Sequence, residues 1–394
     1  MQGPLTGLRV LDMSRVLAGP FCGMILADLG ADVVKIEEPE AGDEARRVGP
    51  FLKGVSTYFA SINRGKQGIT LNLKSEEGKR LFLDMVRRAD ILVENYRPGV
   101  MQRLGLGYPV LREVNPRLVY AACSGFGHSG PYSPRGAYDM IVQGMGGMMS
   151  ITGEVGRQPV RVGSSIGDIT AALFTVIGIL AALHHVRSTG EGQFVDVAML
   201  DCQVAILENA IMRYLVTGEI PGPLGARHPS IAPFEAFPAK DGHVIMAVGT
   251  KIWERFCQAI DRPDLVNHPH FATNALRAEH VSELYEILAP IMRQKTVETW
   301  IQEMEPIGVP CGRVNTVDKV VKDPQVQARE MIVSVEDPEA GTISMAGVPI
   351  KLSATPGKVQ GRAPRLGEHT ETVLAEWLGL SADAVAQLRQ AGVV

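Results

Sequence analysis

The sequence predicts an α/β protein with a Rossmann-like large domain, whose parallel sheet is built from both ends of the chain. Two observations predict this fold. In the first half of the chain, short apolar runs that suit buried strands alternate with stretches of helical length. A Pro/Gly-rich segment, 218–238, then precedes a mostly helical region. We therefore expect the large domain at 1–220, a smaller α+β domain at 225–325, and a return to the large domain at 326–394.

The chain opens with a predicted strand–helix–strand unit. The apolar run Leu8–Met13 suits a buried strand. Pro20 is well placed at the first position of a helix that runs to about Leu29, and Gly30 is a typical C-terminal stop. Asp32–Glu37 is predicted to be the second strand.

Later elements continue the alternation. Ser75 is the predicted N-cap of a helix that runs to about Arg88, with two glutamates in its first turn. Further strands are expected at Gly68–Leu73, Ile91–Glu94, Leu118–Ala122, Pro159–Val162, His243–Val248 and around 341–352, with a final helix near Glu371–Leu378. The apolar run Ile169–Leu183 is shorter than the roughly 18 residues of a membrane span, so we predict a buried core helix and no membrane association.

The composition is that of an ordinary globular protein. Hydrophobic residues make up 45% of the 394 residues, and charged residues make up 21%. The formal net charge of -4 argues against a nucleic-acid partner. The five scattered cysteines and the absence of a secretory pattern indicate reduced thiols in a cytoplasmic protein. His268-Pro269-His270 has no nearby ligand cluster in sequence, so we predict a surface loop and no metal site.

Two short motifs suggest other functions. The first turn reads A-G-P-F-C-G, with Gly19 and Gly23, and lacks the glycine spacing of a dinucleotide-binding fingerprint. The segment 163–167 reads G-S-S-I-G and fits the nucleophile motif of serine hydrolases, with Ser165 as the nucleophile. A triad would also need an acid and a histidine, and Asp196 or Asp201 with His228 or His369 are available but not singled out. A serine hydrolase therefore stays open as an alternative.

Asp168 follows this motif at the start of the apolar helix. Its carboxylate could serve only as an N-cap for backbone N–H groups. The same helix N-terminus favours the anion, so we expect Asp168 to stay ionised even when partly buried. An ionised, poorly solvated carboxylate could attack a thioester carbonyl. The residues alone leave the capping role and the nucleophilic role open.

Five ordered blocks carry a resemblance to a known family. They are L-T-G-L-R-V-L-D-M-S-R-V-L-A-G-P (Leu5–Pro20), L-G-A-D-V-V-K-I-E (Leu29–Glu37), V-E-N-Y-R-P-G (Val93–Gly99), G-V-P-C-G (Gly308–Gly312) and L-G-E-H-T (Leu366–Thr370). With these blocks, the chain resembles the family III CoA-transferases, the group named after carnitine CoA-transferase and bile-acid-inducible F protein. The resemblance implies an interlocked homodimer that uses acyl-CoA and a carboxylic acid as substrates, with no permanently bound cofactor and no metal.

The resemblance also implies site residues. The block Ile166-Gly167-Asp168 matches the family's nucleophile block, so Asp168 is expected to form a covalent aspartyl-CoA thioester. The expected coenzyme A contacts are Arg15, Leu17, Ala18, Lys74, Asn95, Tyr96, Arg97, Arg103 and Tyr138. Their positions after predicted strand ends suit ligand binding in an open α/β sheet. Arg15, Leu17 and Glu38 depart from the formyl-CoA branch of the family.

Within the family, the chain is most similar to the branch that uses succinyl-CoA and dicarboxylic acids. The stretch H-P-S-I-A-P-F (228–234) stands where the formyl-CoA branch has a glycine-rich insertion. The expected substrate residues are Arg46, Asp139 and His228, with Arg46 holding the distal carboxylate as a bidentate pair. Related racemases of 2-methylacyl-CoA esters, the other alternative, carry a histidine where this chain has Tyr138. An unperturbed tyrosine, with a pKa near 10, is a poor base at neutral pH, which favours the transferase.

Overall fold

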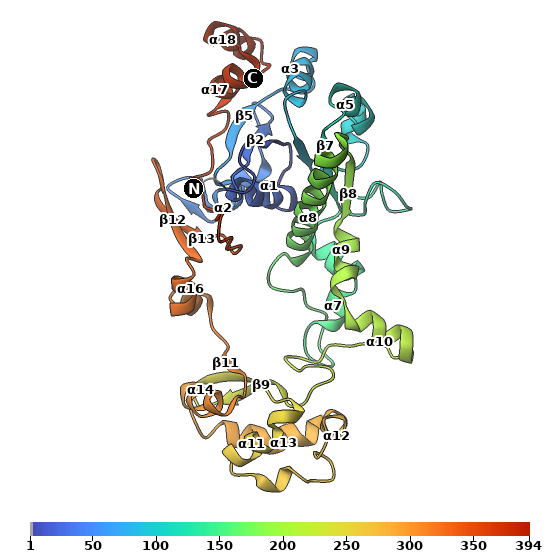
Figure 1. Cartoon of the computed structure of the whole chain (residues 1–394), viewed down its shortest axis with the longest axis vertical. Helices are drawn as coiled ribbons and strands as arrows, with labels where there is room; N and C mark the ends of the chain where they lie inside the picture. Colours follow the sequence, from blue (N-terminus) through green and yellow to red (C-terminus); the bar gives the residue numbers. More distant parts are fainter. Residues whose placement is uncertain (1–2) are drawn as a thin grey trace. The chain divides into compact units, whose positions relative to one another are not determined.

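The computed structural model describes residues 3–394, which divide into two compact units (Figure 1). The first unit contains the residues up to Met148 together with Arg161–Val216 and Pro324–Val394. The second unit contains Met149–Val160 and Thr217–Asp323.

The first unit is built on a six-stranded sheet in which every strand pair is parallel. In spatial order the strands are β5 (Gln67–Thr70), β2 (Asp32–Glu37), β1 (Arg9–Asp12), β6 (Ile91–Glu94), β7 (Val119–Ser124) and β8 (Phe194–Ala198). The chain runs outward from β1 to β5, then crosses back to β6 on the other side of β1. This doubly wound order confirms the predicted α/β class and creates a switch point between β1 and β6. The strand β8 was not predicted.

Helices cover both faces of this sheet, as a parallel sheet requires. Alternate strand residues such as Val10, Val33 and Val119 share one core with α1 (Ala18–Asp28) and α8 (Ile166–Thr189). The residues between them, such as Leu11 and Val34, share the opposite core with the helices of the other layer. Those helices are α3 (Glu76–Val86), α5 (Tyr108–Val114), α17 (Thr370–Leu378) and α18 (Ala382–Gln390) (Figure 1).

The prediction that both chain ends build the parallel sheet is wrong. All six strands come from the N-terminal part of the chain, and β12 (Ile332–Asp337) pairs only with β13 (Gly341–Ala346), antiparallel to it. Both strands of this ribbon alternate between exposed and less exposed residues, whereas a central parallel strand is buried on both faces. The C-terminal segment contributes helices instead, and Trp377 of α17 is fully buried in the core.

The helix α8 is longer than predicted. It spans 24 residues instead of the expected Ile169–Leu183, and by length and composition alone it could cross a membrane. Half of its most apolar window is buried inside the fold, where Ala172, Val176 and Ile179 pack in the same core as α1. This burial agrees with the predicted core helix.

The second unit has its own sheet and core. Its antiparallel strands are β9 (Phe234–Ala239), β10 (Gly242–Ala247) and β11 (Cys311–Arg313), in the order β11-β10-β9. Its main helices are α11 (Trp253–Ala259), α12 (Asn274–Glu279), α13 (Val281–Met292) and α14 (Val297–Met304). Phe237, Trp253 and Trp300 are buried in its core.

The strand predicted at Pro159–Val162 does not form, and this stretch is irregular and mostly exposed.

The remaining elements are short. They are β3 (Phe51–Leu52), β4 (Val55–Ser56), α2 (Thr57–Asn63), α4 (Val100–Arg103), α6 (Asp139–Met145), α7 (Met148–Ile151), α9 (Met199–Ile206), α10 (Asn209–Thr217), α15 (Val317–Val320) and α16 (Pro324–Ala328), with four 3-10 turns, η1 (Glu44–Arg47), η2 (Thr250–Ile252), η3 (Pro263–Leu265) and η4 (Glu305–Ile307). All five cysteines are free thiols, and four of them are buried, as the sequence predicted.

Candidate active site

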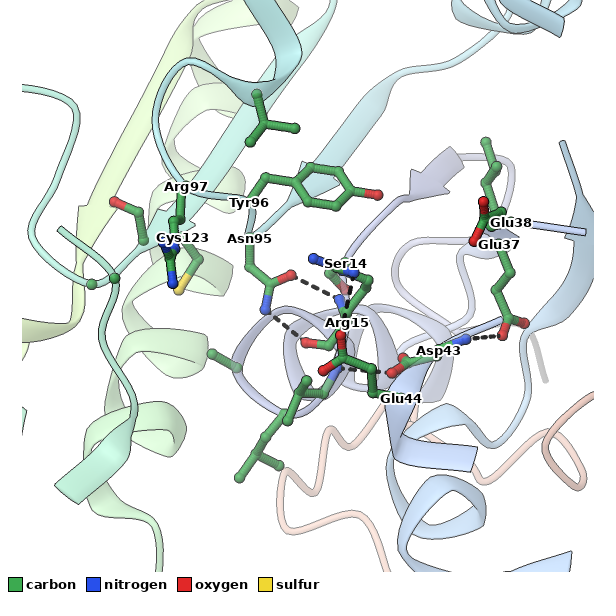
Figure 2. A pocket seen from close by; sticks show the side chains of 18 of the residues that line it. Ser14, Arg15, Glu37, Glu38, Asp43, Glu44, Asn95, Tyr96, Arg97 and Cys123 are labelled. Carbon is green, nitrogen blue, oxygen red and sulfur yellow. Dashed lines mark hydrogen bonds and ion pairs between the residues drawn. The ribbon is translucent and has the colours of Figure 1, made fainter. Parts of the chain in front are cut away.

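A cavity of about 860 Å³ opens at the carboxyl edge of the parallel sheet (Figure 2). Residues that follow β1, β2, β5, β6 and β7 line it. Because these strands are parallel, their carboxyl ends meet at one edge, and the change of direction between β1 and β6 leaves a crevice there. The cavity therefore lies where this topology favours ligand binding.

Ten residues that the sequence predicted for the site line this cavity. They are Asp168, Arg15, Leu17, Ala18, Lys74, Asn95, Tyr96, Arg97, Arg103 and Tyr138. They come from the turns after β1, β5 and β6, the short helix α4, the N-terminus of α6 and the first turn of α8. The structure therefore brings the predicted nucleophile and all the predicted coenzyme A contacts into one cavity.

Asp168 is the third residue of α8, and the N-cap position is held by Ser165. The predicted capping role of Asp168 is therefore wrong. Its carboxylate accepts a hydrogen bond from the backbone N–H of Ala18, at the start of α1. This bond crosses from one helix N-terminus to another and fixes the carboxylate at the cavity wall.

The pKa of Asp168 is raised to about 7. Burial is the largest cause, the negative charge of Asp139 adds to it, and the Ala18 N–H acts in the opposite direction. Asp168 was expected to stay ionised at the helix N-terminus, but burial raises its pKa towards neutrality because it disfavours the charged form.

Asp139 lies behind the cavity wall and does not line the cavity. Its Oδ1 accepts the backbone N–H of Gly167 at 2.8 Å, and its Oδ2 accepts the Gln143 amide at 2.8 Å. The guanidinium of Arg161 lies 3.6 Å from the same Oδ2. The structure thus makes Asp139 a support and an electrostatic neighbour of Asp168.

Arg46 is not placed for the predicted contact with a substrate carboxylate. Its Nε and Nη2 donate to the two carboxylate oxygens of Glu37 at 2.7 and 2.6 Å, and its Nη1 donates to the Pro364 carbonyl at 3.1 Å. Its guanidinium also lies 3.8 Å from the centre of the Phe59 ring. Because the bidentate face already binds Glu37, Arg46 has no free fork for a substrate, and it does not line the cavity.

His228 belongs to the second unit. Its Nδ1 accepts the backbone N–H groups of Ser230 and Ile231, and its ring stacks on Phe234 with centroids 5.2 Å apart. These contacts stabilise the conformation of the H-P-S-I-A-P-F loop.

The second unit also contains the segment His268-Pro269-His270, for which the sequence predicted a surface loop and no metal site. In the structure, His270, His280 and Glu283 offer ligand atoms within 4.8 Å of one another. The rings of His270 and His280 stack nearly parallel, with centroids 3.9 Å apart.

Asn95 holds the turn after β1 in place. Its side-chain oxygen accepts the backbone N–H of Arg15 at 2.7 Å, and its amide nitrogen donates to the Arg15 carbonyl at 2.7 Å (Figure 2). The Arg15 guanidinium lies 5.1 Å from the centre of the Tyr96 ring. The turn after β1 and the turn after β6 are therefore connected by side chains, all of which the sequence predicted to lie in the coenzyme A site.

The cavity lining carries charges of both signs. Six lining residues are cationic, namely Arg15, Arg47, Lys74, Arg97, Arg103 and Arg135, and five are acidic, namely Glu37, Glu38, Asp43, Glu44 and Asp168. The cationic side chains suit phosphate groups, either as bidentate forks or as point charges. The Lys74 ammonium lies 3.1 Å from Glu38, but both side chains are largely exposed, so this pair is weak and leaves Lys74 available to a ligand.

Arg47 and Arg135 are cavity residues that the sequence reasoning missed. Arg47 donates to the Ala41 carbonyl at 2.7 Å, and the Arg135 guanidinium lies 4.1 Å from the centre of the Tyr132 ring. Arg47 directly follows the arginine that was predicted, and Arg135 directly precedes the block that contains Tyr138. Both residues could have been predicted from their positions, because charged residues that follow the strands gather at this edge of the sheet.

A family model described as CoA-transferase family III matches residues 5–370. The chain belongs to CoA-transferase family III. It is 41% identical over 381 residues to the succinate–glutarate CoA-transferase of Agrobacterium fabrum, covering 95% of each chain. It is 39% identical over 394 residues to the succinyl-CoA–D-citramalate CoA-transferase of Chloroflexus aurantiacus, covering 99% of this chain and 98% of the relative. The crystal structure of a CAIB/BAIF family protein from Brucella suis superimposes with a TM-score of 0.85 at 38% identity, covering 96% and 100% of the two chains.

This family III CoA-transferase does not assemble the serine hydrolase triad. Ser165 does not line the cavity, and within residues 3–394 no hydrogen bond joins its hydroxyl to a histidine. Three of the four groups that were available for a triad bind elsewhere: His369 accepts the Gly68 N–H, Asp196 accepts the His128 N–H, and His228 accepts two N–H groups of its own loop. The racemase alternative is not favoured either, since the matched relatives are CoA-transferases.

Proposed function

We propose that the enzyme transfers CoA from succinyl-CoA to a second dicarboxylic acid through a covalent thioester on Asp168. One observation carries the proposal: the Asp168 carboxylate lies in the wall of a cavity whose lining includes six arginine and lysine side chains, against the backbone N–H of Ala18. The names of the Agrobacterium and Chloroflexus relatives, which join succinate or succinyl-CoA to a second dicarboxylic acid, support the substrate class.

The first half of the reaction forms the covalent intermediate. A carboxylate oxygen of Asp168 attacks the thioester carbonyl carbon, and the carbon–sulfur bond breaks to release the CoA thiolate. The product is a mixed anhydride between Asp168 and succinate. The thiolate then attacks the Asp168 carbonyl of this anhydride and releases succinate, which leaves an Asp168–CoA thioester. One bond forms and one breaks in each displacement, and the negative charge passes from carboxylate to thiolate and back.

The second half repeats these steps in reverse with the acceptor. A carboxylate of the second acid attacks the Asp168 thioester carbonyl and expels the thiolate. The thiolate attacks the acceptor carbonyl of the new anhydride, which yields the product CoA ester and restores the Asp168 carboxylate. No proton or electron is gained or lost over the cycle.

The Ala18 N–H has a direct part in this scheme. In the resting enzyme it donates to the Asp168 carboxylate. Whenever the Asp168 acyl carbonyl is attacked, negative charge develops on the oxygen that this N–H faces. A backbone donor already in place stabilises such an oxyanion without reorganisation, and each donor is typically worth about 10²–10³ in rate.

We also propose that the enzyme acts as a homodimer, as the family resemblance implies. Leu173, Phe174 and Ile177 project from the outer side of α8 and are exposed by 44%, 39% and 60%. An apolar group on a helix of this length is typical of a surface that another subunit covers.

The experiment follows CoA exchange directly. The enzyme is incubated with succinyl-CoA and an isotopically labelled dicarboxylate, alongside the Asp168→Ala and Ser165→Ala variants. We expect label to enter the CoA ester pool with the wild type, to vanish with Asp168→Ala, and to be only reduced with Ser165→Ala. Full activity of Asp168→Ala, or loss confined to Ser165→Ala, would contradict the proposal. Exchange of α-protons without transfer between acids would indicate a racemase instead.

A further inference from the structure

The turn that carries Ala18 is held by side chains at nearly every backbone polar group. Asn95 binds the N–H and the carbonyl of Arg15. Asp12 accepts the N–H of Ser14 at 2.9 Å and also its hydroxyl, and Asp43 accepts the N–H of Val16 at 3.1 Å. The Ser14–Leu17 turn is therefore fixed by parts of the chain that are far apart in sequence.

Two buried ion pairs support these hydrogen bonds. The Lys35 ammonium lies 2.9 Å from the Asp43 carboxylate and donates to the Ser14 carbonyl at 2.8 Å. The Lys66 ammonium donates to Asp12 at 2.7 Å. All four side chains have no exposed surface. Burial alone would raise the pKa values of Asp12 and Asp43, but the lysines lower both below the usual value, while burial lowers the pKa of Lys66. We call these four residues the ion set.

Lys66 extends this set to the helix that begins at Ala18. Its ammonium also donates to the Pro20 carbonyl at 2.9 Å and to the Asn63 side chain at 2.8 Å. All three of its donors are thereby used. The ion set is thus hydrogen-bonded both to the turn before α1 and to the first turn of α1.

The backbone of this turn is strained and closely packed. Val16 has a φ of +65°, a left-handed conformation that is strained for a β-branched residue. A Cβ on Gly19 would lie 2.2 Å from the Ser14 Cβ, and a Cβ on Gly23 would lie 2.5 Å from an Asp12 carboxylate oxygen. The two glycines of the A-G-P-F-C-G turn therefore make room for the ion set and the Ser14 turn.

Net stability does not explain four charges in this place. Removing two ion pairs from water costs about as much as their mutual attraction returns, and well-packed apolar residues often stabilise a fold equally well. A strained turn persists only where several surrounding contacts hold it in that conformation, and such turns are common at functional sites. Here the ion set provides these contacts, directly beside the nucleophile.

We propose that Asp12, Lys35, Asp43 and Lys66 are positioning residues, which set the Ser14–Ala18 turn so that the Ala18 N–H faces the Asp168 carboxylate. This inference rests on the proposed role of Asp168 as the nucleophile. Of the four, only Asp43 lines the cavity, and its side chain has no exposed surface. In this scheme none of the four contacts a reacting group. They act through the backbone of the turn, and a reacting group must be held within about 0.5 Å of its productive position.

The test removes one ion pair without leaving a buried charge. The double variant Lys35→Met/Asp43→Asn keeps an oxygen that can accept the Val16 N–H, but it loses both charges and the bond to Ser14. The single variant Asp43→Asn is a second probe: it keeps the Lys35 bond to the Ser14 carbonyl but leaves the buried Lys35 charge without its partner, so its thermal stability is measured alongside. The matched control is Arg64→Met/Asp28→Asn, which removes an equally buried ion pair of 2.7 Å at the other end of α1.

The readout is a rapid-quench measurement of CoA transfer from succinyl-CoA to the protein in a single turnover. The amplitude reports the fraction of folded sites, and the rate reports how well Asp168 and Ala18 are placed. We expect the Lys35→Met/Asp43→Asn variant to keep its amplitude and its KM for succinyl-CoA within about threefold, while the rate falls about 10- to 100-fold. We expect the control variant to lose thermal stability and amplitude but to keep the wild-type rate.

The outcomes separate the two proposals. If the wild type forms no adduct, or if Asp168→Ala still forms one, the proposed function itself fails. If the wild type behaves as expected but both Asp43 variants keep the wild-type rate within twofold, the positioning role is wrong. A loss of amplitude with an unchanged rate also contradicts it, because that result assigns the ion set to stability alone.

Discussion

Asp139 accepts the backbone N–H of Gly167 at 2.8 Å, immediately before Asp168 in α8. One carboxylate thus supports the backbone that carries the other. The negative charge of Asp139 also adds to burial in raising the pKa of Asp168 to about 7. The structural support of the nucleophile and the control of its ionisation come from the same residue.

Replacing Asp139 with asparagine should lower the pKa of Asp168. Asparagine keeps an oxygen for the Gly167 N–H but removes the charge that disfavours the Asp168 anion. Because the anion is the attacking form, kcat/KM for succinyl-CoA should rise with pH through a midpoint near 7 in the wild type, and at a lower pH in Asp139→Asn. The measurement is kcat/KM from pH 5 to 9, with Asp201→Asn as a control. An unchanged midpoint in Asp139→Asn would show that burial alone sets this pKa.

Replacing Asp168 with asparagine should make the fold more stable at high pH. The folded-state pKa of about 7 lies above the ordinary value of 3.8, so the folded protein holds this proton more tightly than the unfolded chain. The contribution of Asp168 to stability therefore falls as the pH rises from about 4 to 7, and the loss is complete above pH 7. We expect Asp168→Asn to gain on the order of 2–4 kcal/mol over wild type between pH 4 and pH 8. Urea unfolding of both proteins at these two pH values measures the difference, and a constant difference would contradict the raised pKa.

Replacing Arg46 with alanine should weaken the fold and leave substrate choice unchanged. Arg46 binds the Glu37 carboxylate with two hydrogen bonds, and Glu37 is 5% exposed. Its loss leaves a buried carboxylate without its partner, which should cost about 2–4 kcal/mol. The checks are the unfolding free energy and the ratio of kcat/KM values for a dicarboxylate and a monocarboxylate of equal length. A selective loss of dicarboxylate activity would restore the substrate role that the sequence suggested for Arg46.

Lys74 and Glu38 should affect acyl-CoA binding in opposite directions. Their side chains form an exposed ion pair of 3.1 Å at the cavity. We expect Lys74→Ala to raise the KM for acyl-CoA, and Glu38→Gln to lower it by freeing the ammonium, each by roughly threefold because exposed pairs are worth under about 1 kcal/mol. Both effects should fade at high salt. Equal KM values in the two variants would place the CoA phosphates elsewhere in the cavity.

The alternating pattern of the first half of the chain was sufficient to predict the parallel sheet, because buried strands such as Asp32–Glu37 and Ile91–Glu94 are short apolar runs between helices. It was not sufficient for β8, a five-residue run, F-V-D-V-A, that Asp196 interrupts and that is mostly only partly buried. The C-terminal segment misled the prediction for a related reason. Local pattern identifies a strand such as Gly341–Ala346, but not the partner with which it pairs.

The candidate site, like the fold, was predictable from the sequence only in part. Residues such as Arg15 and Asn95 were predicted from the family resemblance, and their positions after strand ends agree with it, because topology gathers such residues at one edge. The partner of each charged group was not predictable. Arg46 was expected at a substrate but binds Glu37, and Asp168 was expected to stay ionised but has a pKa that burial raises to about 7. Both outcomes depend on three-dimensional neighbours and on solvent exposure, neither of which a linear pattern contains.

The most direct test of the central claim is the mass of the protein after brief reaction with succinyl-CoA in the absence of an acceptor acid. We predict that a fraction of the wild-type enzyme gains the mass of CoA less one water, and that peptide mapping places this adduct on Asp168. Hydroxylamine should remove it, and Asp168→Ala should never form it. An adduct on another residue, or transfer that proceeds at the wild-type rate in Asp168→Ala, would contradict the account.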